Sequence, residues 1–117
     1  MGFFFTKADR LLKRSDFLRL TAKGRQCQNN NFIAVFVPGK TERTRLGITA
    51  SRKIGNATVR NRIKRFSREY FRLNKHKNIG ILDINIIAKK GAVNLSSAQT
   101  FLSLQNIFDK ITRSFYH

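Results

Sequence analysis

A stretch between residues 53 and 74 places two kinds of side chain at helical spacing. At about 100° per residue, one side of the stretch is apolar: Val59, Ile63, Phe66, Tyr70 and Leu73. The opposite side carries cations and one amide: Asn61, Lys64, Arg65, Arg68 and Arg72. The pattern predicts a helix with one face in a protein core. Its other face suits a polyanion, of which nucleic acid is the commonest large example in a cell.

Positive charge is concentrated in this predicted helix and just before it. Eight cations stand against one acid, Glu69. The cations are Arg52, Lys53, Arg60, Arg62, Lys64, Arg65, Arg68 and Arg72. A solvated helix face usually mixes both signs, whereas a face of one sign suits phosphates, whose condensed counterions are released on binding. Arginine also offers phosphate a planar fork and stacks on bases.

Asn61 is the one neutral polar residue in the cationic face. From the spacing, two interpretations are equally open. The amide could be a neutral spacer near the start of a helix. It could instead contact the edge of a nucleotide or a hydrated metal ion at an RNA surface.

The chain offers few groups for catalysis. Its six acids are scattered and mostly adjacent to basic residues: Asp9, Asp16, Glu42, Glu69, Asp83 and Asp109. No Ser/His/Asp set and no glycine-rich phosphate loop is evident. One cysteine, Cys27, and two histidines, His76 and His117, exclude an internal disulfide and a plausible set of metal ligands. We therefore expect no reaction from this chain alone.

Aromatic side chains could supply stacking platforms for single-stranded bases. The candidates are Phe17, Phe32 and Phe36. Most phenylalanines in a small domain belong to the core. Phe17 is favoured because it lies on a short predicted helix that is also needed to cover a sheet.

The elements that position these residues follow from apolar patterning and turn residues. In chain order we expect a basic arm at 6–14, a helix at 16–23, strands at 31–37 and 45–51, the basic helix at 56–74, a strand at 80–88 and a helix after Ser96-Ser97. Ser15-Asp16 is expected to cap the first helix, and Gly55-Asn56 to open the basic one. Glu69 is expected to pair with Arg65 or Arg72. This order indicates an α+β sandwich of helices packed on a sheet.

Composition sets the class of the protein. The chain has 117 residues, 24 Lys and Arg against 6 Asp and Glu, a net charge of +18 and 41% apolar residues. These values predict one folded, basic RNA-binding domain over 1–117, with a basic arm at 1–14 whose order without RNA is left open. The apolar start is too short for a secretion signal, and no run has transmembrane length. We expect a cytoplasmic protein that does not contact membranes.

The motif at 53–69, with Arg-Asn-Arg at 60–62, resembles the signature of the bacterial ribonuclease P protein family. The likeness continues in 10–24, 45–49 and 83–91, and so covers nearly the whole chain. It implies an α-β-β-β-α-β-α sandwich of the ribosomal protein S5 domain 2-like type, with a left-handed crossover through the basic helix. The residue patterns alone contain two strands before that helix, where the family fold has three.

The resemblance also implies a function, that of the protein component of ribonuclease P. This RNA enzyme hydrolyses a phosphodiester bond to remove the 5′ leader of precursor tRNA. Its RNA subunit carries the catalysis with bound Mg²⁺. The implied partners are the RNase P RNA and precursor tRNA, with no obligate protein partner. The protein strengthens metal binding and holds the single-stranded leader between its first helix and the sheet.

Site residues follow position by position from the same resemblance. The RNA-facing positions are Arg52, Lys53, Arg60, Asn61, Arg62, Lys64, Arg65 and Arg68. Phe17 matches an aromatic residue of the leader cleft, and Phe36 is the second candidate there. The family often has further aromatics where this chain has Thr21 and Val35. Phe36, next to Val35, points to the opposite face of a regular strand. Leader contact would then rely more on Phe17 and basic residues, or on a shifted register.

Two other functions compete with this interpretation. A small basic ribosomal or RNA-chaperone-like protein explains the charge but not the long motif. A duplex-DNA binder would place the basic helix in the major groove. It is disfavoured because the arginines spread around too much of the helix and no dimer seam is evident.

Overall fold

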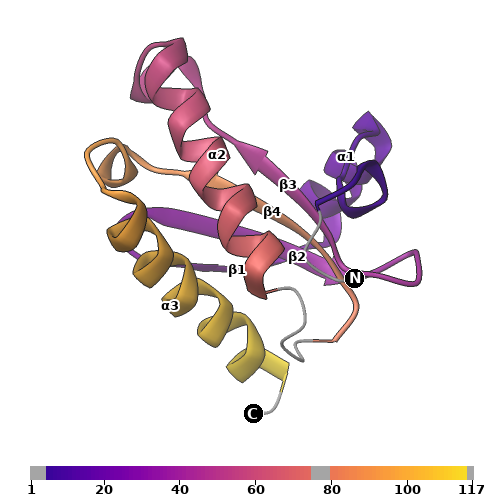
Figure 1. Cartoon of the computed structure of the whole chain (residues 1–117). Coiled ribbons are helices and arrows are strands. Elements are labelled where there is room, and N and C mark those ends of the chain that lie inside the picture. Colours follow the sequence, from indigo (N-terminus) through magenta and orange to yellow (C-terminus); the bar gives the residue numbers. More distant parts are fainter. Residues whose placement is uncertain (1–4, 75–79, 116–117) are drawn as a thin grey trace.

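The computed structural model describes residues 5–74 and 80–115 of the chain. Its elements, in chain order, are η1 (Lys7–Asp9), α1 (Arg14–Lys23), β1 (Arg25–Gln28), β2 (Phe32–Pro38), β3 (Arg45–Thr49), η2 (Arg52–Ile54), α2 (Ala57–Asn74), β4 (Leu82–Ala88), η3 (Lys90–Ala92) and α3 (Ser97–Phe115). Helices α2 and α3 cover one face of a sheet, and α1 packs on the other (Figure 1). The α+β class expected from the sequence is confirmed.

The sheet has four strands in the order β1-β2-β4-β3. The β1–β2 and β2–β4 pairs are antiparallel, and β3 runs parallel to β4. Helix α2 is therefore the crossover between two parallel neighbours. The residue patterns missed strand β1 because three of its four residues are polar and it lies at an edge with little burial. Only its backbone pairing with β2 reveals it.

Side chains alternate between two apolar clusters, one on each face of the sheet. On β2, Phe32, Ala34 and Phe36 enter the larger cluster beneath α2 and α3. Val35 and Val37 face α1 and join a smaller cluster with Leu11 and Leu20 as well as Phe17. Because the period of a strand is two residues, neighbouring positions serve different faces. This alternation decides which side chains of β2 face α1 and which face α2 and α3.

The N-terminal arm differs from its expected extended form. It contains η1, and Arg10 then forms an isolated bridge with Leu46 of β3. The backbone N–H of Leu11 donates to the carbonyl of Leu46 at 3.1 Å. Helix α1 begins at Arg14, so the expected Ser15-Asp16 cap is wrong. Asp16 instead lies inside the first turn of the helix. It is buried there and accepts a hydrogen bond from Arg45 of β3.

The core face of α2 is turned relative to the expected stripe. Ile63, Ser67, Tyr70 and Phe71 are buried, whereas Leu73 is 42% exposed. Ser67 can be buried because its hydroxyl donates to the carbonyl of Ile63 at 2.8 Å. Phe71 is covered by Phe5 of the arm, whose ring meets it edge-on with centroids 5.7 Å apart. The arm therefore widens the buried side of the helix toward Phe71.

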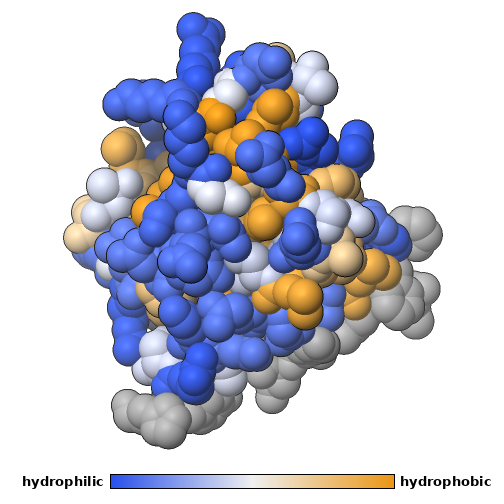
Figure 2. Space-filling view, turned by 90° about the vertical axis from the view of Figure 1, so that its left-hand side faces the viewer, coloured by the Kyte–Doolittle hydropathy of each residue, from blue (hydrophilic) through white to orange (hydrophobic). Residues whose placement is uncertain are grey.

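The surface in Figure 2 shows the side of the molecule with the start of α3. Hydrophilic residues dominate it, and apolar residues appear between them. The most exposed large apolar side chain among the described residues is that of Leu102 of α3, at 72%. No helix within residues 5–74 and 80–115 is long and apolar enough to cross a membrane.

Candidate nucleic-acid interface

The approach to α2 presents the first two cations of the predicted interface. Arg52 and Lys53 lie in η2 and are exposed. Asn56 then starts the helix, because its side-chain Oδ1 accepts the backbone N–H of Val59 at 3.0 Å. A Cβ added to Gly55 would lie only 3.1 Å from the Cβ of Val59. A larger residue at 55 would therefore press on the first turn of α2.

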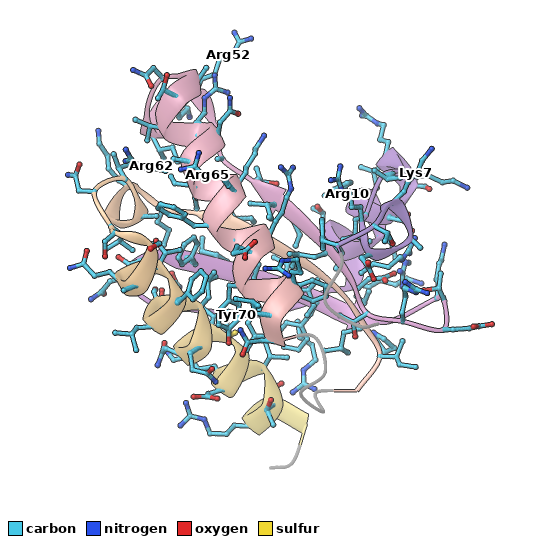
Figure 3. All side chains as sticks on the ribbon, in the orientation of Figure 1. Lys7, Arg10, Arg52, Arg62, Arg65 and Tyr70 are labelled. Carbon is cyan, nitrogen blue, oxygen red and sulfur yellow. The ribbon has the colours of Figure 1, made fainter. Side chains whose placement is uncertain are left out.

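The structure exposes half of the eight predicted RNA-facing residues and partly buries the rest. Exposed are Arg52, Lys53, Asn61 and Arg65; half-buried are Arg60, Arg62, Lys64 and Arg68. In the described part of the chain, none of the seven cations among them pairs with an acid. Figure 3 shows Arg52 projecting from the end of the molecule, with Arg62 and Arg65 farther along α2. The result is a run of uncompensated positive charge along η2 and α2.

Arg62 differs from its neighbours in having a fixed partner. Its Nη2 donates to the backbone carbonyl of Val93, in the segment that leads into α3. This contact draws the side chain toward η3 and away from the exposed line of the helix. Arg62 can therefore position the segment before α3 as well as present charge.

Two other arginines of α2, Arg60 and Arg68, lie in surroundings that are unfavourable for a cation. The Nε of Arg60 is buried and has no hydrogen-bond partner among the described residues. Burial, together with the nearby positive charge of Arg10, lowers the pKa of Arg68. An anion at this surface would relieve both costs, because unpaired buried polar groups and adjacent like charges are unfavourable.

The single acid of α2 does not neutralise the predicted interface. Glu69 pairs with Arg72 rather than Arg65, and the hydrogen bond from Arg72 lowers the pKa of the Glu69 carboxyl. Arg65 instead lies over the ring of Phe66, 5.3 Å from its centroid. The exposed cations nearer the start of α2 therefore keep their charge without an internal partner.

Asn61 lies between these cations and is exposed. Its side chain makes no hydrogen bond to any other described residue. The amide is thus open to a ligand, and its role stays a prediction.

Helix α1 packs closely on one face of the sheet, and we call the strip of surface where the two meet, beside Phe17 and Gly47, the groove. Phe17 rests directly on Gly47 of β3: a Cβ at position 47 would come within 2.8 Å of the Phe17 ring. Just past the end of α1, a Cβ added to Gly24 would lie 2.4 Å from the Cγ1 of Val35 of β2. Two glycines therefore let helix and sheet approach closely, and Phe17 is left half-buried at the groove.

Phe36 is not in this groove, and the expectation that it lines a leader cleft is wrong. Its side chain is 1% exposed and belongs to the larger core beneath α2 and α3. Regular alternation along β2 sends Val35 to the α1 face in its place. Thr21, the other departure, is exposed, and its hydroxyl donates to the carbonyl of Phe17. Phe32 is buried in the same core, so of the three aromatic candidates only Phe17 lies beside the groove.

Polar residues that the sequence analysis missed also lie on this face of the sheet. Asn85 of β4 sits beside Gly47, and its amide exchanges hydrogen bonds with the hydroxyl of Thr49. Lys89 donates to the side chain of Gln28 on the edge strand. Polar residues alternating with isoleucines in 82–88 were the available signal. These polar residues show that the face of β4 toward α1 carries polar as well as apolar side chains.

The acids do not gather into a metal site within the described ranges. No group of three or more His, Cys, Asp or Glu residues there could hold an ion. Asp9, Asp16 and Asp83 are each engaged by arginine side chains. These carboxylates stabilise the fold around α1 and the arm.

Known proteins resemble this chain in sequence and in fold. The sequence model of the family described as Ribonuclease P matches residues 5–112. The ribonuclease P protein component of Desulforapulum autotrophicum is 48% identical over 97% of this chain and 97% of its own length. That of Desulfatibacillum aliphaticivorans is 45% identical over 99% and 98%. The solved RNase P protein of Staphylococcus aureus has a TM-score of 0.82 at 36% identity, covering 89% of this chain and 95% of its own.

Proposed function

The chain belongs to the ribonuclease P protein family, and we propose from this premise that it acts in the removal of the 5′ leader of precursor tRNA. In this role it binds the RNA subunit of the enzyme through η2 and α2. It contacts the leader through the groove beside Phe17. We place this work in the cytoplasm.

The observation that carries the proposal is a run of seven cations along η2 and α2, none of which pairs with an acid among the described residues, while the other face of α2 is core. These cations are Arg52, Lys53, Arg60, Arg62, Lys64, Arg65 and Arg68. Because α2 is anchored through Ile63 and Tyr70, the cations are held in a fixed array. An RNA backbone gains counterion-release free energy from such an array. Because its backbone is already ordered in a helix, this array also loses less backbone entropy on binding than a disordered basic tail would.

The leader is the part of the substrate that fits the groove. A single strand exposes its bases, and these stack on aromatic rings and apolar surface. Phe17 supplies one ring edge, and Val35 and Asn85 lie on the sheet face beside it. With one aromatic, the groove suits a leader of any sequence better than recognition of one base.

Catalysis belongs to the RNA subunit in this proposal. Mg²⁺ supplied with that RNA would activate the attacking water and stabilise the leaving oxygen. The acids of this chain do not form the ligand set that a catalytic ion needs within the described ranges. Its cations instead bring the RNA subunit and the leader together and offset phosphate repulsion.

Reconstitution tests the proposal. The purified chain is mixed with a bacterial RNase P RNA and precursor tRNA at low Mg²⁺, where the RNA alone is slow. The expected result is faster cleavage at the 5′ end of the mature tRNA. No gain in cleavage would overturn the proposal, and cleavage by the chain alone would show that it carries catalytic groups.

The same experiment separates the rival functions. A ribosomal or chaperone-like protein would bind many RNAs without a specific gain in 5′ cleavage. A duplex-DNA binder would bind duplex DNA more tightly than RNA of the same length and charge. A competition series with unrelated RNA and duplex DNA distinguishes these outcomes.

A further inference from the structure

A basic pocket lies between the N-terminal arm, the start of α1 and the 40–45 loop. Its volume is about 730 Å³. Eleven residues line it; six are Lys or Arg and two are acids. The six cations are Lys7, Arg10, Lys13, Lys40, Arg43 and Arg45. We call this hollow the arm pocket; it has no part in the interface on α2 or in the groove beside Phe17.

Five of the six cations of the arm pocket, all except Arg10, divide into two groups. Arg45 and Arg43 are occupied within the protein: Arg45 pairs with buried aspartates, and Arg43 pairs with Asp9 at 3.2 Å. Lys7, Lys13 and Lys40 are exposed, and none of them pairs with an acid of the described chain. The paired arginines build the wall, and the three free ammonium groups face solvent.

The pocket is linked to α2 through the arm. Phe5 packs on Phe71 of α2, and the guanidinium of Arg10 lies over the Phe5 ring at 5.3 Å from its centroid. Arg68 lies one turn before Phe71 on the same helix. In Figure 3, Arg10 lies between α2 and Lys7. Positive charge therefore continues from α2 across Arg10 to the arm pocket.

This placement of like charges has an electrostatic consequence. Arg10 and Arg68 come from distant parts of the chain, and the arm nevertheless holds them near each other. Neighbouring cations repel unless an anion lies between them. A polyanion that follows the surface from α2 would relieve this repulsion and meet the three free lysines next.

We propose that the arm pocket is a second phosphate-binding site, which holds backbone phosphates of the same RNA subunit that α2 binds. The inference rests on the proposed function. The lysines act as point charges on phosphate rather than as readers of bases. The site therefore adds affinity and fixes the orientation of the protein on the RNA without adding sequence preference.

The test measures the salt dependence of binding to RNase P RNA, without precursor tRNA. The variant Lys13→Gln/Lys40→Gln removes one ammonium from each side of the pocket. If both contact phosphate, the slope of log K against log salt falls by about 1.4 to 1.8. The control Lys110→Gln/Arg113→Gln removes the same charge from α3, and its slope is expected to change far less.

A third variant gives the opposite change. Glu42→Gln removes an acid that lines the pocket. It is expected to tighten binding at moderate salt, a gain that misfolding cannot produce. Thermal unfolding of each variant checks that the fold is intact.

Five outcomes decide between these possibilities. A lower slope for the pocket variant, together with tighter binding by Glu42→Gln, supports the site. Equal slopes for the pocket and control variants overturn it. In a parallel salt series with precursor tRNA in place of RNase P RNA, a lower slope seen only there would also overturn the site, because the phosphates would then come from the substrate. If Arg60→Ala/Arg65→Ala changes the slope and the pocket variant does not, only this inference fails; if neither does, the proposed function fails too.

Discussion

Arg45 of β3 forms a bidentate ion pair with Asp83 of the neighbouring strand β4. Its Nε and Nη2 lie 3.0 and 2.8 Å from the two carboxylate oxygens. Asp83 is fully buried, and Arg19 of α1 donates to the same carboxylate. Arg45 also donates to Asp16 of α1 at 3.3 Å. The network ties α1 to both parallel strands, next to the groove where Phe17 lies.

Asp83→Asn is expected to destabilise the protein by roughly 3–5 kcal/mol, because it removes the buried charge that Arg19 pairs with and one of the two carboxylates that Arg45 pairs with. Urea unfolding of the variant and the parent measures the difference. The matched control is Glu69→Gln, the same chemical change at an exposed ion pair, expected to cost less than about 1 kcal/mol. Equal effects of the two variants would show that the buried network does not hold the fold.

Arg60→Ala/Arg65→Ala is expected to weaken binding of RNase P RNA and to flatten its salt slope by about 1.4 to 1.8, since two phosphate contacts are lost. Filter binding over a salt series measures the slope. Lys110→Ala/Arg113→Ala on α3 serves as the control for net charge. An unchanged slope for the α2 variant would mean that these two arginines do not touch phosphate.

Phe17→Ala is expected to lower affinity for precursor tRNA by about 1–2 kcal/mol, roughly 5- to 30-fold, through the loss of base stacking. Affinity for mature tRNA, which lacks the leader, should stay unchanged in the reconstituted enzyme. Gly47→Ala should act in the same direction, because its Cβ displaces the Phe17 ring. Equal losses for precursor and mature tRNA would place the effect outside the leader.

Tyr70 is expected to make stability fall at high pH. Burial, with a smaller effect of Asp109, raises the pKa of Tyr70 to about 12 from its usual value of 10.0. The unfolded chain therefore loses its phenolic proton first, and stability present below pH 10 declines as the pH rises toward 12. Relative to Tyr70→Phe, the parent should lose roughly 2–3 kcal/mol over this window. Urea unfolding across that pH range measures it, and parallel curves for the two proteins would contradict the raised pKa.

Phe71→Ala is expected to cost about 3–5 kcal/mol, since it empties a buried site beneath Phe5. Leu73→Ala, two residues on, should cost less than about 1 kcal/mol because its side chain is 42% exposed. Chemical denaturation of both variants compares them directly. A larger loss at Leu73 than at Phe71 would restore the core face expected from the sequence.

Some of the fold could be predicted because its signals are local. Apolar spacing of three and four residues identified α2, and the Asn56 cap marked its start. Strand β1 could not be predicted in this way. Only one of its four side chains is apolar, so the strand has no alternating pattern. Its extended form depends on backbone hydrogen bonds to β2, which the side chains of β1 do not indicate. The order of the strands likewise depends on long-range pairing.

The sequence by itself determined that α2 has a cationic face of one sign, because charge and helical period are properties of neighbouring residues. Only the tertiary structure decided which residues of other elements lie next to that face. Packing of Phe5 on Phe71 brought Arg10 to Arg68, and the alternation of β2 sent Phe36 into the core while Val35 faced α1. These outcomes depend on the burial of apolar surface between elements that are far apart in the chain. The spacing of neighbouring residues does not determine which distant elements pack together.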